Sequence, residues 1–109
     1  MRIYLAAPLF SQSDRVYNRR LRDALERRLP ACEVILPQDF RTDAAGRFND
    51  RRHLGTLYRQ CTDALRQADL VVARLDGADA DSGVAFEVGY ARALDKPVVG
   101  LRTDFRHLQ

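Results

Sequence analysis

The chain has 109 residues, of which 46% are hydrophobic and 30% charged, with 6 Gly, 4 Pro and a net charge of +3. This composition is typical of one soluble domain of on the order of 100–150 residues, and it excludes collagen-like, low-complexity and largely disordered chains. No stretch approaches the roughly 18 consecutive apolar residues of a membrane span, and the first residues reach Pro8 too early for a signal peptide. We therefore expect residues 1–109 to form a single cytoplasmic domain that does not bind membranes.

The basic residues are almost all arginine, with Lys96 as the one lysine, and acidic residues balance most of them. A nucleic-acid-binding chain would collect its arginines on one face or in a tail. Here they are spread along the sequence beside acidic and apolar residues. Solvated helix faces are therefore the favoured interpretation, and we expect no nucleic-acid partner.

The first 30 residues predict a strand and a helix. Arg2–Ala7 is a short apolar run that ends at Pro8. Ser11 and Asp14 then stand at the spacing of a capping box, and apolar residues recur at helical intervals until Pro30 ends the helix.

The middle of the chain predicts a second strand, a long loop and a second helix. Glu33–Leu36 is a short apolar run that ends at Pro37. Residues 38–52 contain Asp, Thr, Gly and Asn and predict a loop, which at that length is often functional. Apolar side chains at helical spacing then predict an amphipathic helix: Leu54, Leu57, Tyr58, Cys61, Leu65 and Ala68.

The last third predicts strand, loop, helix and strand. Asp69–Leu75 has the nearly continuous apolar character of a central parallel strand. The turn-rich segment Asp76–Gly83 leads into a helix at Val84–Leu94, and Pro97–Leu101 predicts a fourth strand. This order predicts an α/β fold, a flavodoxin-like or Rossmann-like three-layer sandwich with a parallel sheet of four to five strands and right-handed crossovers.

Ligands in such sheets bind at the carboxyl ends of the strands, where Glu87 is the first candidate for chemistry. It lies on an apolar arc of its helix, and a lone carboxylate there is costly unless it is paired or used. The alternative is a first-turn carboxylate that reaches solvent or a local donor at the helix N-terminus. The opposite arc is also apolar, so we expect the helix to be covered by the sheet and by a further surface, such as another subunit: Ala85, Phe86, Gly89 and Ala93.

An acidic loop precedes this helix, with Asp76, Asp79 and Asp81. Two carboxylates in one cleft suit glycosyl transfer, in which one attacks the anomeric carbon and another group handles the proton of the leaving group. Two alternatives stay open, since the loop could bind Mg²⁺ or could cap the helix through Asp81 or Ser82.

Several other kinds of site are excluded. The loop after the first strand has no glycine, so a P-loop and a GxGxxG fingerprint are absent, and no GxSxG occurs. His53 and His107 lack partners at metal-ligand spacing. Cys32 and Cys61 lack CxxC spacing, which favours two free thiols over a disulfide or a metal site.

Four segments together resemble the nucleoside 2-deoxyribosyltransferase family: Ile3–Ser11, Leu36–Gln38, Asp81–Ala91 and Lys96–Asp104. The most specific is Asp81–Ala91, with an aspartate six residues before a glutamate that is followed by x-Gly-Tyr-Ala. The resemblance implies that Glu87 is the nucleophile, that Asp81 holds the sugar hydroxyls and that Asp63 helps protonate or orient the base. It also implies a retaining reaction on a 2′-deoxynucleoside and a free nucleobase, with no metal and no cofactor.

The resemblance also assigns substrate contacts. Tyr4 and Phe10 would stack on the base, Gln38 would read the base edge through its amide, and Gly83 would permit close approach at the helix. Core packing is the alternative for Tyr4, and an exposed helix acid is the alternative for Asp63.

The chain departs from the family in two ways. Relatives continue past the fourth strand, and an Asn-containing segment from a neighbouring subunit completes their site. No such segment can be assigned here, so either the chain is truncated or its site is closed differently; we expect a homo-oligomer with a shared site. The loop at Thr42–Arg52 also matches no family feature.

Two other functions stay open. A 2′-deoxynucleoside 5′-phosphate N-hydrolase would use the same nucleophile with a phosphate site, which Ser11, Ser13 and Arg15 could provide, although Pro8–Phe10 favours unphosphorylated nucleosides. A non-catalytic nucleotide-binding module would keep the fold without the reaction.

Overall fold

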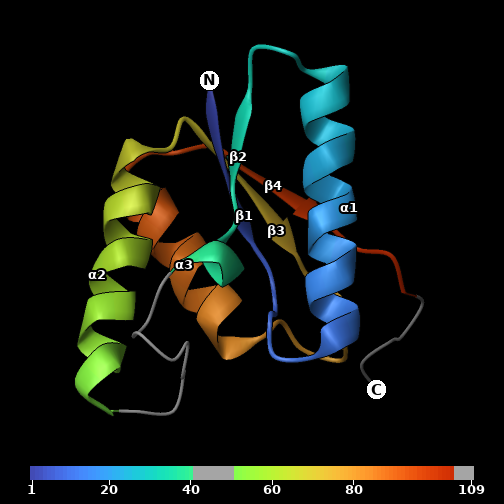
Figure 1. Ribbon diagram of the computed structural model, residues 1–109. Helices are drawn as coiled ribbons and strands as arrows, with labels where there is room; N and C mark the ends of the chain where they lie inside the picture. The colour runs from blue at the N-terminus through green and yellow to red at the C-terminus, as the bar shows by residue number, and fades with distance from the viewer. Residues whose placement is uncertain (41–50, 105–109) are drawn as a thin grey trace.

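The computed structural model describes residues 1–40 and 51–104, with side chains from residue 55 onward in the second range. It contains four strands, three α-helices and one 3₁₀ helix (Figure 1): β1 Arg2–Ala6, α1 Gln12–Arg28, β2 Glu33–Ile35, η1 Pro37–Asp39, α2 Arg51–Gln67, β3 Leu70–Arg74, α3 Ser82–Ala93 and β4 Val98–Leu101. The α/β prediction is confirmed.

The strands form one parallel sheet in the order β2-β1-β3-β4. Helix α1 covers one face of the sheet, and α2 and α3 cover the other, which gives three layers (Figure 1). Because the sheet order reverses after β2, the loops that follow β1 and β3 lie at the point where a parallel sheet commonly binds ligands.

Alternation along β1 divides the core in two. Ile3 and Leu5 pack in the cluster that includes Leu21 and Leu25 of α1. Tyr4 instead joins the cluster under α2 and α3 and is fully buried. Successive side chains of a strand point to opposite faces, so this register directs the Tyr4 hydroxyl toward α3.

Local signals explain where the helices begin. The Ser11 hydroxyl accepts a hydrogen bond from the Asp14 amide at 3.0 Å and caps α1. The Asp81 carboxylate accepts from the amides of Gly83 and Val84 at 3.0 and 3.2 Å and caps α3, as one of the alternatives above predicted.

Two details of the sequence-based prediction are wrong, and a third is not decided by a single chain. The predicted loop at residues 38–52 contains part of η1 at its start, and Arg51 already belongs to α2; residues 41–50 lie outside the described residues. The first strand ends at Ala6, because Pro8 has no N–H to continue the ladder. The second apolar arc of α3 is exposed in the part of the chain that the structure describes, and its cover by a further surface, such as another subunit, stays a prediction: Ala85, Phe86, Gly89 and Ala93.

None of the helices described is both long and apolar enough to cross a membrane.

Candidate active site

A pocket of about 230 Å³ lies between α2, α3 and the loops that follow β1 and β2. We call it the Glu87 pocket, and eight residues line it: Leu9, Pro37, Leu57, Tyr58, Cys61, Gly83, Phe86 and Glu87. Two larger hollows, of about 710 and 450 Å³, lie along α1, and no carboxylate is among the described residues that line the second, which include Val16 and Tyr17. The Glu87 pocket is the better candidate because it combines an apolar lining with a buried carboxylate at the carboxyl edge of the sheet.

Glu87 contributes a carboxylate to the lining of this pocket. Its side chain is buried, with the residue 9% exposed, and its Oε2 accepts a hydrogen bond from the Tyr4 hydroxyl. Burial raises the pKa of Glu87 to about 7; the Tyr4 hydrogen bond opposes this change, and the negative charge of Asp81 adds to it. A carboxylate with a pKa near neutrality can exist in both protonation states at physiological pH.

Tyr4, on β1, is the hydrogen-bond donor to this carboxylate. Burial, together with the charge of Glu87, raises the pKa of the Tyr4 hydroxyl, so the hydroxyl keeps its proton and acts as a donor. Cys61 lies beside both groups, and burial raises its thiol pKa although a hydrogen bond with Tyr4 works in the opposite sense. The arrangement fixes one carboxylate oxygen of Glu87 against the core.

Asp81 lies next to the pocket at the start of α3. A Cβ at Gly83 would lie 3.1 Å from Asp81 Oδ2, so a residue with a side chain would crowd the cap. Gly83 therefore keeps the helix start narrow at the pocket. The negative charge of Asp81 also raises the pKa of Glu87, and a shared catalytic role of the two carboxylates stays a prediction.

Five predicted site residues are not among those that line the Glu87 pocket: Tyr4 and Asp81, described above, and Phe10, Gln38 and Asp63. Asp63 is on the surface of α2, where it forms an ion pair with Arg66, and its side chain is 57% exposed. Phe10 is 74% exposed, and it is its neighbour Leu9 that lines the pocket. The site roles of Asp63 and Phe10 stay predictions.

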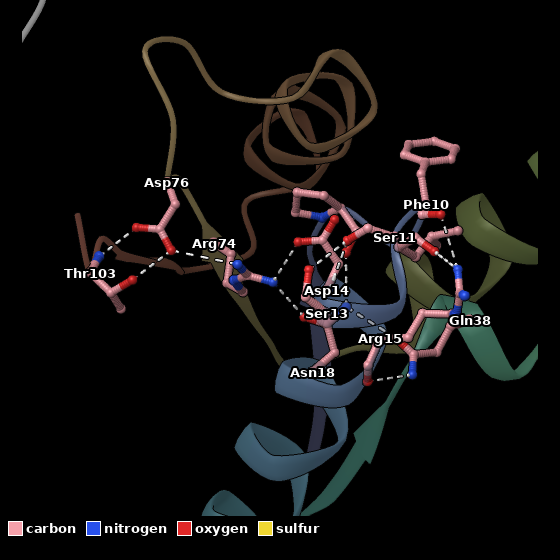
Figure 2. Close-up of polar contacts among 12 residues, drawn as sticks. Phe10, Ser11, Ser13, Asp14, Arg15, Asn18, Gln38, Arg74, Asp76 and Thr103 are labelled. Atoms are coloured by element: carbon pink, nitrogen blue, oxygen red, sulfur yellow. Dashed lines mark hydrogen bonds and ion pairs between the residues drawn. The ribbon is translucent and has the colours of Figure 1, made fainter. Parts of the chain in front are cut away.

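The Gln38 amide is engaged within the protein (Figure 2). Its Oε1 accepts from Asn18 Nδ2 at 3.0 Å, and its Nε2 donates to the backbone carbonyl of Arg15 at 3.0 Å. Gln38 thus ties η1 to α1. Its contact with a base stays a prediction, because both ends of the amide already have partners.

Sequence reasoning missed most of the apolar lining. The sequence predicts Tyr58 and Cys61 only as apolar positions of an amphipathic helix, and in the structure both line the pocket. Phe86 lies between Tyr58 and Tyr90, with ring centroids 5.8 and 5.9 Å away. The available signal was the apolar second arc of α3, which is exposed among the described residues.

No group of three or more His, Cys, Asp or Glu residues suited to a metal ion occurs within the part of the chain that the structure describes.

Comparison with known proteins identifies the family. No curated protein matches the chain. Among solved structures, a conserved protein from Enterococcus faecalis V583 is 36% identical, with a TM-score of 0.80 over 95% of this chain and 64% of its own. A 2-desoxiribosyltransferase from Leishmania mexicana is 26% identical, with a TM-score of 0.75 over 96% of this chain and 66% of its own.

A 2-deoxyribosyltransferase from Bacillus psychrosaccharolyticus, 20% identical, shares the fold with a TM-score of 0.82 over 100% of this chain and 77% of its own. The chain thus spans slightly less than two thirds of the first two structures. The sequence profile described as nucleoside 2-deoxyribosyltransferase matches residues 3–109. Because that match extends over nearly the whole sequence, the chain belongs to the nucleoside 2-deoxyribosyltransferase family.

Proposed function

We propose that the chain exchanges the base of 2′-deoxynucleosides by transferring the 2-deoxyribosyl group through Glu87. One observation supports this most directly: the buried carboxylate of Glu87 lies at the edge of an otherwise apolar pocket and accepts a hydrogen bond from Tyr4. A carboxylate in such a place suits covalent glycosyl transfer, because a desolvated and oriented oxygen is a better nucleophile toward an electrophilic sugar carbon.

The proposed reaction has two displacements. Tyr4 engages Oε2, so we assign the attack on C1′ to Oε1 of Glu87. A C1′–O bond forms as the C1′–N bond breaks, and the departing base keeps the electron pair and gains a proton. A second base then attacks C1′ from the opposite face: a new C1′–N bond forms as the C1′–O bond to Glu87 breaks, and the N–H proton of this base returns to the acid that protonated the first base. The two displacements give net retention.

Asp81 and Asp63 are the two further carboxylates proposed to take part in the reaction, and the structure supports their roles to different degrees. Asp81 is beside Glu87, and we propose that it holds the sugar hydroxyls. Asp63 is proposed to supply the base proton, but its ion pair with Arg66 must open first. Of the proposed acids, Asp63 has the weakest geometric support.

The aromatic lining suits a flat, apolar substrate portion. Phe86 and Tyr58 lie 5.8 Å apart at the mouth of the pocket and are 45% and 55% exposed. Such rings stack on heterocyclic bases, and we propose that they take the stacking role that the sequence assigned to Phe10. We also propose that a second copy of the chain covers these exposed rings, which light scattering would test.

The loop after β1 favours an unphosphorylated substrate over a 5′-phosphate. Arg15 Nη1 donates to the carbonyls of Leu9 and Phe10 at 3.0 and 3.1 Å. The Ser11 hydroxyl accepts from the Asp14 amide and shares a hydrogen bond of 3.0 Å with the Ser13 hydroxyl, and the Asp14 carboxylate adds a negative charge to the same turn. Arg15 and both serine hydroxyls therefore already have partners within the protein.

The test is a base-exchange assay. The protein is incubated with a 2′-deoxynucleoside and a second free base, and the products are separated chromatographically beside the Glu87→Ala variant. A new deoxynucleoside from the wild type alone supports the proposal. Free base from a 5′-monophosphate but not from the nucleoside would support the N-hydrolase instead. No turnover of any of these compounds would favour the non-catalytic module.

A further inference from the structure

Arg74, the last residue of β3, is a cation with almost no contact with solvent. The residue is 9% exposed, and Figure 2 shows it among side chains of α1 and of the loop after β3. Its Nη1 donates to Asn18 Oδ1 at 3.0 Å and lies 3.6 Å from Asp14 Oδ1. Its Nη2 lies 3.6 Å from Asp76 Oδ2, and the guanidinium is 4.5 Å from the centre of the Tyr17 ring.

Asn18 extends this contact to both loops beside the Glu87 pocket. It is 2% exposed, and its Nδ2 donates to the Pro8 carbonyl at 2.9 Å and to Gln38 Oε1 at 3.0 Å. Pro8 precedes Leu9, and Gln38 follows Pro37; Leu9 and Pro37 both line the pocket. A continuous series of hydrogen bonds therefore runs from β3 to one side of the pocket.

A role in stability alone does not account for this arginine. Burying a guanidinium requires its desolvation, and Arg74 Nε has no hydrogen-bond partner among the described residues. Apolar residues of similar volume are often as stable in such places. The guanidinium does, however, fix the orientation of the Asn18 amide. Because it donates to Asn18 Oδ1, the NH₂ group of Asn18 points at Pro8 and Gln38.

We propose that Arg74 is a positioning residue: through Asn18 it holds the β1–α1 loop and η1 where they shape the Glu87 pocket for substrate. The inference rests on the proposed function, because its effect on activity is read as binding of a 2′-deoxynucleoside. Neither Arg74 nor Asn18 touches the reacting atoms. Substitution of either residue should therefore change the shape of the pocket while Glu87 and Tyr4 keep their contact.

Two variants test the two parts of the series. Asn18→Asp keeps an acceptor for Arg74 but replaces the two donated hydrogen bonds by repulsion between oxygens. Arg74→Met removes the charge with little change in length. Arg2→Met is the control, because Arg2 lies at the opposite end of the sheet, where it pairs with Glu33. We expect KM for the deoxynucleoside to rise about tenfold in the first two variants, with kcat within about threefold of wild type.

Amide hydrogen exchange provides a second readout that needs no activity. Exchange at residues 8–11 and 37–40 should accelerate in Asn18→Asp and Arg74→Met, while exchange in β1 and α3 stays near that of Arg2→Met. Unchanged KM and unchanged loop exchange would overturn the proposal, as would unfolding of both variants or a fall in kcat without a rise in KM. If the wild type turns over no nucleoside, the proposed function fails, and the exchange rates alone still decide the positioning role.

Discussion

Replacement of Glu87 by glutamine should remove activity and yet stabilise the fold above neutral pH. In the folded protein, burial raises the pKa of Glu87 from the ordinary 4.5 to about 7. A raised carboxyl pKa means that the folded state prefers the protonated form. The stability that this preference gives is fully present below about pH 4.5 and is lost as the pH rises through about 7.

The size of the effect follows from the two pKa values. The difference between 4.5 and about 7 corresponds to about 3 kcal/mol, of which about 2 kcal/mol is lost between pH 5 and pH 8. Glutamine is uncharged at every pH and still accepts a hydrogen bond from Tyr4. The advantage of Glu87→Gln over the wild type should therefore grow by about 2 kcal/mol over this interval.

Urea unfolding of both proteins near pH 5 and near pH 8 measures this difference directly. Other titrating groups are common to both chains, so their contributions cancel when the free energies of unfolding are subtracted. Glu33→Gln is the control, since it makes the same chemical change on a side chain that is 70% exposed. An advantage of Glu87→Gln that does not change with pH, or that shrinks at pH 8, would refute the reasoning.

Three further predictions concern the pocket and the loop beside it. Because Glu87 must ionise to attack, kcat/KM should rise with pH through about 7, and a profile that falls over this range would contradict the assignment. Tyr4→Phe should move the inflection to higher pH, because the hydrogen bond from Tyr4 lowers the pKa of Glu87 in the wild type and its removal lets that pKa rise. A bulky maleimide should inactivate the protein slowly at Cys61, whose thiol pKa is raised by burial, and a deoxynucleoside should protect it; equal inactivation of Cys61→Ser would disprove that site. Asp76→Ala should lower the free energy of unfolding by about 1–3 kcal/mol, because Asp76 accepts hydrogen bonds from the segment after β4; an unchanged urea midpoint would show that these bonds add nothing.

Local patterns in the sequence were enough to predict the fold and to select Glu87 as a candidate. Strand and helix periodicity gave the order of elements, and the apolar arc around Glu87 left two alternatives, a paired or used carboxylate and one that reaches solvent; in the structure the side chain is buried. The Asp81 cap is also a local feature, because its carboxylate binds the amides of residues only two and three positions further along the chain. The order of elements and the Asp81 cap are set by neighbours close in the chain, whereas the carboxylate of Glu87 is held by Tyr4, 83 residues away.

The direction of loop and surface side chains could not be predicted in this way. Leu9 and Phe10 are adjacent and both apolar, yet Leu9 lines the pocket while Phe10 is 74% exposed, because no periodicity applies in a loop. Asp63 was assigned to the site by resemblance, but Arg66, one turn away, pairs with it on the surface. The sequence places Arg74 near the end of an apolar strand and gives no sign of its contacts. Its partner Asn18 could not be predicted, because it is 56 residues away in sequence.

The central claim is that a 2-deoxyribosyl group is carried covalently on Glu87. Intact-protein mass spectrometry after mixing with a 2′-deoxynucleoside, without an acceptor base, tests it most directly. We expect a species heavier by one deoxyribosyl group, located by peptide mapping to Glu87 and absent from Glu87→Gln. Turnover with no such species, or with the group on another residue, would contradict it.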